Sequence, residues 1–199
     1  MATDTQAKPA RLQPYRLTVR QYLGMIDAGL FPPNARVELL GGILVRKMVK
    51  GDPHDGSLWA IGEQIRRLIP PGWVVREDKS LQLGARSRLE PDLAIVPGPG
   101  EQYFARTPRA QNTALVVEVS DSTYAYDRGV KWRRYAAARV PAYWIVNLGK
   151  RQVEVYRQPT GAGTSATYQF TEIFGEDAAV SVLIDGAEVG RIAVRDILP

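Results

Sequence analysis

The sequence contains no cysteine and a single histidine among its 199 residues. Disulfide bridges, thiolate nucleophiles and cysteine-ligated zinc are therefore excluded, and so is a zinc site built from clustered histidines. No apolar run approaches the roughly 20 residues that a membrane-spanning helix requires. The first residues also lack the apolar segment of a secretion signal. We therefore expect a soluble, cytoplasmic protein that does not enter a membrane.

The glycine and serine motifs of several enzyme classes are missing as well. The chain has no Gly-x-x-x-x-Gly-Lys-Ser/Thr loop and no Gly-x-Gly-x-x-Gly fingerprint, so nucleoside triphosphates and dinucleotides lack their usual binding loops. It also has no Gly-x-Ser-x-Gly elbow for a serine nucleophile. A formal net charge of +5 favours a polyanionic partner such as nucleic acid, although many enzymes with other substrates are equally basic.

The length and composition predict one folded domain. The apolar fraction of 45% is ordinary for a globular protein, and no internal repeat or linker divides the chain. Residues 1–14 are polar, small and proline-bearing, so we interpret them as a flexible arm. Residues 15–199 are then expected to form a single domain.

Local patterns predict a mixed α/β order. A capping box at Thr18 and Gln21 predicts a short helix that ends near Gly29. Residues 36–48 are expected to form a β-hairpin around a Gly-Gly turn. The other expected elements are helices at 53–69 and 126–139, strands at 73–76, 80–83, 91–96, 114–119, 142–147, 152–157 and 168–174, and a strand followed by a helical turn at 189–198.

Two carboxylates lie in segments that otherwise have the pattern of buried strands. Asp92 follows Pro91 at the start of an apolar run, and Glu118 is flanked by leucine and valine. An ionised carboxylate in such a strand is costly unless it is paired, hydrogen-bonded or bound to a metal. Two alternatives stay open: Asp92 could close a turn through a backbone N–H, and Glu118 could form a structural salt bridge.

A divalent cation would account for both acids. Mg²⁺ prefers hard oxygen ligands, commonly one or two carboxylates completed by water and phosphate oxygens, and Mn²⁺ can substitute for it. Asp92, Glu118 and the main-chain carbonyl of Val119 could supply the protein ligands. The metal would lower the pKa of a bound water and offset charge that develops on a phosphate.

Lys131 is the cation that the pattern brings closest to these acids. It lies 13 residues after Glu118, and Asp127, Lys131 and Tyr135 share one face of the predicted helix. A lysine there could orient the attacking water or neutralise the scissile phosphate. The alternative is an ordinary exposed Asp–Lys pair that contributes little.

Weaker candidates surround this trio. Glu38, in the first hairpin, could turn toward the same metal or face solvent, and His54 could act in catalysis or simply lie near a helix start. Arginines on the helices could bind phosphates, although solvated helix faces explain them equally well. The arginines predicted to contact nucleic acid are Arg128, Arg133 and Arg134.

Several motifs together carry a family resemblance. They are Arg36-Val-Glu-Leu-Leu-Gly-Gly, His54, Pro91-Asp92-Leu-Ala-Ile-Val, Val116-Val-Glu-Val-Ser-Asp-Ser-Thr, Tyr126-Asp-Arg-Gly-Val-Lys131, Tyr135 and Val140-Pro-Ala-Tyr-Trp-Ile-Val-Asn. With them, nearly the whole chain resembles the Uma-two family of endonucleases, within the PD-(D/E)XK restriction-endonuclease-like superfamily. The resemblance implies a central mixed sheet flanked by helices, with an added N-terminal helix and hairpin, and Mg²⁺-dependent hydrolysis of phosphodiester bonds.

The resemblance also assigns roles to residues. Asp92 matches the aspartate of the PD pair, and Glu118 matches the acid of the second half-motif. The usual lysine two positions after that acid would fall on Ser120, and the family's lysine is Lys131 instead, while Glu38 and His54 match family positions as well. Asn147 stands where relatives carry aspartate, and we interpret it as structural.

Three functions remain open from the sequence. The leading one is a metal-dependent nuclease acting on DNA, for which a homodimer would be the simplest way to cut both strands. The second is a catalytically silent nucleic-acid-binding module on the same fold, motivated by Ser120 in place of the usual lysine. The third is an assembly domain, suggested by the aromatic side chains of Tyr103, Phe104, Tyr124 and Tyr126.

Overall fold

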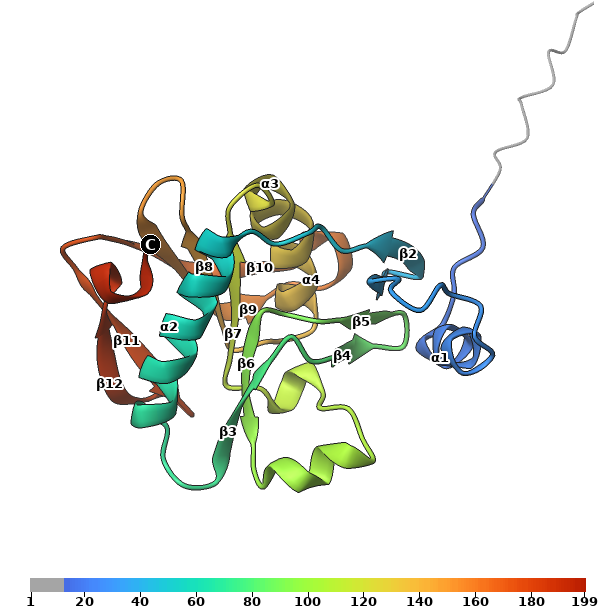
Figure 1. The fold of residues 1–199 in the computed structure, drawn as a ribbon, viewed down its shortest axis with the longest axis horizontal. Coiled ribbons are helices and arrows are strands. Elements are labelled where there is room, and N and C mark those ends of the chain that lie inside the picture. Colours follow the sequence, from blue (N-terminus) through green and yellow to red (C-terminus); the bar gives the residue numbers. More distant parts are fainter. Residues whose placement is uncertain (1–12) are drawn as a thin grey trace, which may run out of the picture.

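A six-stranded mixed sheet forms the centre of the computed structural model, which describes residues 13–199 (Figure 1). Its strands lie in the order β10-β9-β8-β7-β6-β3. Within it β7 and β8 run parallel, and the other neighbours are antiparallel. The strands are β3 (Trp73–Glu77), β6 (Leu93–Pro97), β7 (Leu115–Ser120), β8 (Ala142–Asn147), β9 (Gln152–Thr160) and β10 (Thr167–Gly175).

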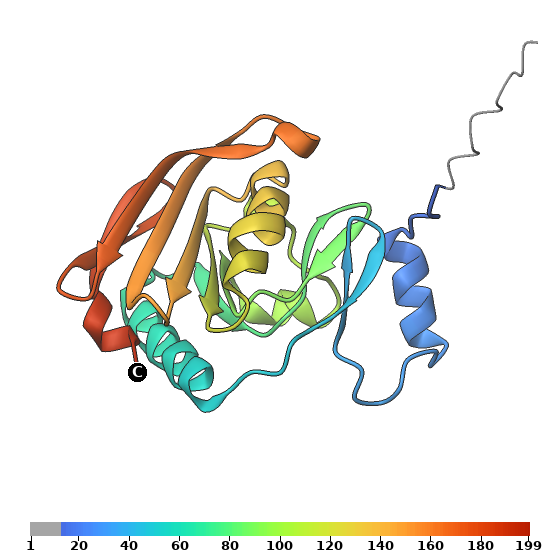
Figure 2. The same ribbon diagram turned by 90° about the horizontal axis from the view of Figure 1, so that it is seen from above.

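Two sets of helices cover the two faces of this sheet (Figure 2). The alternation of side chains along each strand explains the division, because successive residues point to opposite faces. On one face Leu93, Val117 and Trp144 pack against α2 (Asp52–Leu68). On the other face Val116 and Tyr143 pack against the helices that connect β7 to β8. The mixed α/β fold with helices on both faces, predicted from the sequence, is confirmed.

The connection from β7 to β8 is less regular than expected. Instead of one α-helix at 126–139 it comprises α3 (Tyr124–Tyr126), a π-helical turn η3 (Asp127–Lys131) and α4 (Trp132–Ala137). The carbonyl of Asp127 accepts the N–H of Trp132, five residues on, and also the hydroxyl of Tyr143 at 3.1 Å. The tyrosine bond draws this carbonyl toward the sheet, which gives a physical reason for the departure from α-helical pitch.

A smaller antiparallel sheet holds the N-terminal elements. Its order is β2-β1-β5-β4, with α1 (Val19–Asp27) packed beside it. The predicted capping box is present, since the Thr18 hydroxyl accepts the Gln21 N–H at 3.2 Å and the Gln21 side chain accepts the Thr18 N–H at 2.9 Å. The strands are β1 (Val37–Leu40), β2 (Ile43–Arg46), β4 (Leu81–Gly84) and β5 (Ser87–Leu89).

The C-terminal residues form a two-stranded sheet of β11 (Ala179–Ile184) and β12 (Ala187–Ala193), followed by the 3-10 turn η5 (Val194–Ile197). The strand and helical turn predicted at 189–198 are thus found, whereas β5 and β11 were not predicted. Short 3-10 segments also occur at η1 (Gly100–Phe104), η2 (Ala110–Asn112) and η4 (Gly163–Ser165). No helix among the described residues has the length and apolarity to cross a membrane. The predicted arm at 1–14 falls almost entirely outside the described residues.

Candidate active site

Asp92 and Glu118 meet at one end of the six-stranded sheet. The antiparallel register of β6 and β7 pairs Leu93 with Val117, so Asp92 and Glu118 come one step beyond that pair. Pro91 precedes the strand, where its missing N–H removes no ladder bond. The two acids that the sequence singled out are therefore neighbours.

Asp92 is a buried carboxylate held by three donors. The Val119 N–H donates to its Oδ2 atom at 2.7 Å, and the His54 Nε2 atom lies 3.1 Å from the same oxygen. The Lys50 ammonium lies 2.8 Å from Oδ1. Burial acts to raise the pKa of Asp92, but the bond to His54 and the charges of Lys131 and Lys50 outweigh it and hold that pKa well below its usual range. Asp92 is therefore ionised at neutral pH.

Glu118 is even more enclosed, with 1% of its surface exposed. The Lys131 ammonium lies 2.9 Å from its Oε2 atom, and the Tyr135 hydroxyl donates to Oε1 at 2.7 Å. Burial, together with the nearby negative charges of Asp92 and Asp127, raises the pKa of Glu118 to about 8. The positive charge of Lys131 offsets only part of this rise. An added cation would relieve this excess of negative charge.

Lys131 is buried among several carboxylates. Its ammonium contacts Glu118 and also Asp127, at 3.2 Å. Burial lowers its affinity for a proton, yet these carboxylates together with Glu38 and Asp92 raise the pKa of Lys131 well above its usual value. The ammonium is therefore a permanent positive charge at neutral pH. The alternative of an exposed Asp–Lys pair is wrong, because both side chains are buried.

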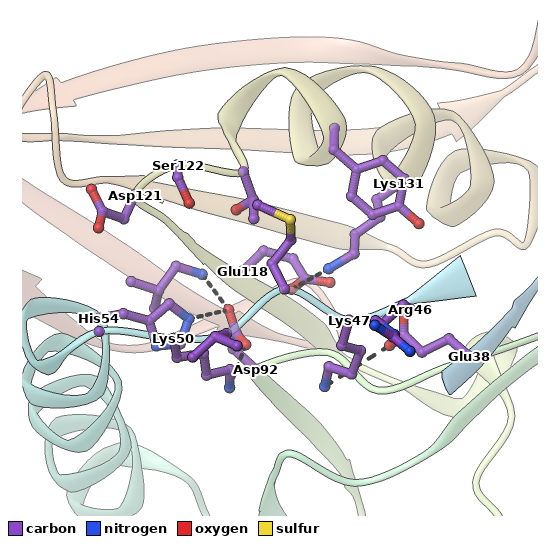
Figure 3. Close-up of a pocket in the computed structure, with 16 residues that line it drawn as sticks. Glu38, Arg46, Lys47, Lys50, His54, Asp92, Glu118, Asp121, Ser122 and Lys131 are labelled. Carbon is purple, nitrogen blue, oxygen red and sulfur yellow. Dashed lines mark hydrogen bonds and ion pairs between the residues drawn. The ribbon is translucent and has the colours of Figure 1, made fainter. Parts of the chain in front are cut away.

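One cavity of about 70 Å³ brings these groups together (Figure 3). Such a volume holds about two waters at roughly 30 Å³ each, or an ion with its water. The strand end, the β2–α2 linker, the start of α2 and the segment after β7 all contribute to it. Among the residues that line it are Glu38, Lys47, Lys50, His54, Asp92, Glu118, Val119, Asp121, Ser122, Tyr126 and Lys131.

The donor set fits a hard divalent cation. Among residues 13–199 no three His, Cys, Asp or Glu side chains stand close enough to form a metal cluster. Mg²⁺ commonly uses only one or two carboxylates and keeps several waters, so Asp92 and Glu118 on one cavity satisfy that requirement. Val119, predicted as a carbonyl ligand, lines the same cavity. The ammonium groups of Lys50 and Lys131 stand where such a cation would compete for carboxylate oxygens.

Glu38 and His54 also border this cavity. Glu38 accepts the Glu90 N–H at 2.6 Å and lies 4.0 Å from the Lys47 ammonium. Burial raises its pKa, and the charge of Lys131 partly opposes that rise. In Figure 3 Glu38 lies on the side of Lys47, whereas His54 points at Asp92 from the first turn of α2. His54 is therefore in direct contact with a site carboxylate, and Glu38 is at the edge.

The predicted arginines do not line the cavity. The Nε atom of Arg128 lies 3.5 Å from Glu154, and its guanidinium stacks over Trp132. The guanidinium of Arg134 lies against Gly41, whose φ of +59° favours glycine. Arg133 is exposed. None of the three is among the cavity residues, so the prediction of a phosphate-binding rim stays a prediction.

Two site residues were missed by sequence reasoning. Lys47 and Lys50 come from the linker between β2 and α2, and each ammonium is largely buried. Lys47 approaches Glu90 at 3.4 Å, and Lys50 contacts both Asp92 and Asp78. The only hint in the sequence was a cluster of basic residues before a helix start, which solvated loops also show.

Ser120, at the position where the superfamily usually has a lysine, forms a hydrogen bond of its own. The Ser120 hydroxyl donates to the Asp127 side chain at 2.7 Å, and Asp127 in turn contacts Lys131. Ser120 therefore holds Asp127, which in turn contacts Lys131. The side-chain Oδ1 atom of Asn147 accepts the Lys150 N–H at 3.1 Å in the β8–β9 turn, which agrees with a structural role.

A solved structure shares this mixed-sheet fold. A crystal structure described as “a putative nuclease belonging to DUF820” from Anabaena variabilis aligns with a TM-score of 0.62 and 16% identity, over 91% of this chain and 97% of that one. The Uma2 model, described as “Putative restriction endonuclease”, matches residues 19–193. The chain therefore belongs to the Uma2 family, as the sequence motifs indicated. No curated protein matches it.

Proposed function

We propose that this chain is a divalent-metal-dependent endonuclease that hydrolyses phosphodiester bonds in DNA. The observation that carries the proposal is the shared cavity of Asp92 and Glu118, with the Lys131 ammonium 2.9 Å from Glu118. Family membership and the fold shared with the structure described as “a putative nuclease” support the same reaction class. The strongly perturbed carboxylates are also what an active site requires.

The proposed roles follow from the contacts. Asp92, Glu118 and the Val119 carbonyl would hold Mg²⁺, with Mn²⁺ as a substitute. A bound ion would acidify a water ligand and stabilise charge on the phosphate. Lys131 stays protonated, so it acts as a fixed positive charge beside the scissile phosphate rather than as a base.

Two further residues position these groups. His54 holds Asp92 Oδ2, leaving Oδ1 to face Lys50 or a cation. Glu38 is assigned an auxiliary role through its position at the cavity edge and its electrostatic effect on Lys131. Both are therefore positioning residues in this proposal.

The test is cleavage of supercoiled and linear DNA with Mg²⁺ or Mn²⁺. Asp92→Asn should lose at least about 100-fold in rate, because an isosteric amide removes the ligand charge while preserving shape. Asp177→Asn is the matched control, since that carboxylate is 98% exposed and outside the cavity. Calorimetry with Mn²⁺ gives an independent measurement. Cleavage at the wild-type rate by both Asp92→Asn and Glu118→Gln would rule the proposal out.

A catalytically silent nucleic-acid-binding module is the second candidate. The specific observation in its favour is that each site carboxylate already has a lysine partner, Lys50 for Asp92 and Lys131 for Glu118. In that case DNA would bind in a salt-sensitive manner, would not be cut with any metal, and would bind Glu118→Gln equally well. A homodimer remains part of the leading proposal, and sedimentation with and without DNA tests it.

A further inference from the structure

A second concave region lies at the other end of β6, away from Asp92. Two adjoining hollows of about 570 and 430 Å³ share Gln82, Tyr103, Arg106 and Thr107. They are formed by the segment after β6, by β4 and β5, and by Leu23 of α1. We call this region the arginine–aromatic groove, defined by Arg88, Tyr103, Phe104, Arg106 and Arg109.

The charge of the groove has one sign. Arg88, Arg106 and Arg109 line it, and neither hollow is lined by an aspartate or glutamate. Within residues 13–199 these three arginines make no ion pair at 4.0 Å or less. By contrast, the exposed Arg151 and Arg195 are paired with carboxylates. Unneutralised arginines facing one hollow favour an anionic ligand.

The groove also presents aromatic rings. Phe104 is 90% exposed, which is unusual for so large an apolar side chain. Its neighbour Tyr103 is fixed, since its hydroxyl donates to the Pro97 carbonyl at 2.8 Å. The guanidinium carbons of Arg76 and Arg106 lie 4.8 and 5.9 Å from the Tyr103 ring centroid. Arginine side chains and aromatic rings therefore lie side by side on this surface.

We propose that the arginine–aromatic groove binds a single-stranded nucleic-acid segment. Its phosphates would contact Arg106 and Arg109, and an unpaired base would stack on Phe104, the combination used by proteins that bind single strands. An acidic protein segment would satisfy the arginines but has no use for the exposed ring. A duplex would present its phosphates but keep its base faces covered.

The inference rests on the proposed function, and it adds a contact outside the active site. β6 runs from Leu93, the residue after Asp92, to Pro97. Its five residues span roughly 17 Å, which separates the groove from the proposed cutting position. The groove would therefore contact the substrate away from the position that is cut, and its loss should weaken binding more than the chemical step.

The experiment measures fluorescence anisotropy of a labelled oligothymidine of about 15 nucleotides, in EDTA so that nothing is cut. Phe104→Ala should weaken binding about 10-fold, the effect expected for one stacked base. Arg106→Gln and Arg109→Gln should each reduce the slope of log K against log salt by about 0.7, as expected for one lost phosphate contact. Phe170→Ala and Arg191→Gln, exposed on β10 and β12, are the matched controls and should bind as wild type does.

The outcomes separate this inference from the proposed function. If wild type cuts DNA but the groove variants bind the oligonucleotide normally, the groove inference is wrong and the nuclease stands. If no DNA is cut but the groove variants weaken binding, the groove inference stands alone. A wild type that binds no single strand overturns it. So does equal competition by polyglutamate together with normal binding by Phe104→Ala, since the surface would then be a general polyanion site.

Discussion

Two buried glutamates on the same face of the central sheet have similar surroundings but opposite shifts in pKa. Register places Glu118 of β7 opposite Ile145 of β8, and Ile145 opposite Glu154 of β9. Both glutamates are at most 2% exposed. The same helical turn covers them, with Lys131 over Glu118 and Arg128 near Glu154. The comparison therefore holds the face of the sheet, the surface exposure and the covering helical turn nearly constant.

What differs is the balance of donors and acids. Glu154 receives the Tyr156 hydroxyl, the Gln152 amide at 3.1 Å and the Asn147 amide at 3.4 Å. Burial acts against ionisation there, but these hydrogen bonds outweigh it, and the pKa of Glu154 is lowered. Glu118 instead shares Lys131 with other carboxylates, and its pKa is raised. A satisfied carboxylate stabilises a fold, whereas one left short of positive charge can accept a cation.

The largest expected effect comes from exchanging each glutamate for its amide. Glu118→Gln should lose at least about 100-fold in DNA cleavage, because it removes a proposed metal ligand. Glu154→Gln should cut DNA normally and lose about 1 kcal/mol of unfolding free energy, through weaker hydrogen bonds. Cleavage assays and urea denaturation of both variants measure the two effects. If Glu154→Gln lost cleavage while its stability stayed normal, the assignment of Glu154 to stability alone would be wrong.

A smaller effect is expected at Lys50. Its ammonium lies 2.8 Å from Asp92 Oδ1, where a cation would bind, so Lys50→Met should tighten Mn²⁺ binding about 10-fold, a small part of the local Coulomb energy. Lys79→Met, an exposed lysine outside the cavity, is the control. Titration calorimetry measures both. Weaker Mn²⁺ binding by Lys50→Met would show instead that Lys50 holds Asp92 in place for the metal.

The smallest effect concerns acid. The pKa of Glu154 is lower folded than unfolded, where about 4.3 is usual, so folding is favoured by its ionised form. Its contribution is fully present above about pH 4.3 and is lost as pH falls through the folded pKa. The stability difference between wild type and Glu154→Gln should therefore shrink on acidification. Urea midpoints from about pH 3 to pH 7 check this, and a constant difference would contradict the assignment.

The sequence was most informative where a residue conflicted with its surroundings. Asp92 and Glu118 stood out because acids are costly inside apolar strands, and the structure brings them together on one cavity. Lys131 followed from helical spacing and reaches Glu118. The central strands and the helix α2 were predictable from their hydrophobic periodicity for the same reason, because a regular apolar pattern reflects burial.

Other features had no local signature. Lys50 reaches Asp92 only because the β2–α2 linker crosses the end of the sheet. The basic residues of this linker do not indicate where in the fold it lies. The strand β5 has three residues, too few for an alternating pattern. The π-helical turn depends on Tyr143, 16 residues further on, so nearby residues could not predict it. Contacts between segments far apart in the sequence were therefore the features that the sequence predicted least well.

That wider turn has a consequence for how the family could vary. Shortening the segment between Asp127 and Lys131 by one residue would restore ordinary helical pitch and rotate everything on one side of it by roughly 100°. Because Lys131 and Tyr135 lie one turn apart and both contact Glu118, a core that keeps Tyr135 would also keep Lys131, and the rotation would fall on Asp127. A single-codon deletion would then change the contacts of Asp127 with Ser120 and Lys131 while the other contacts of Glu118 stayed as they are.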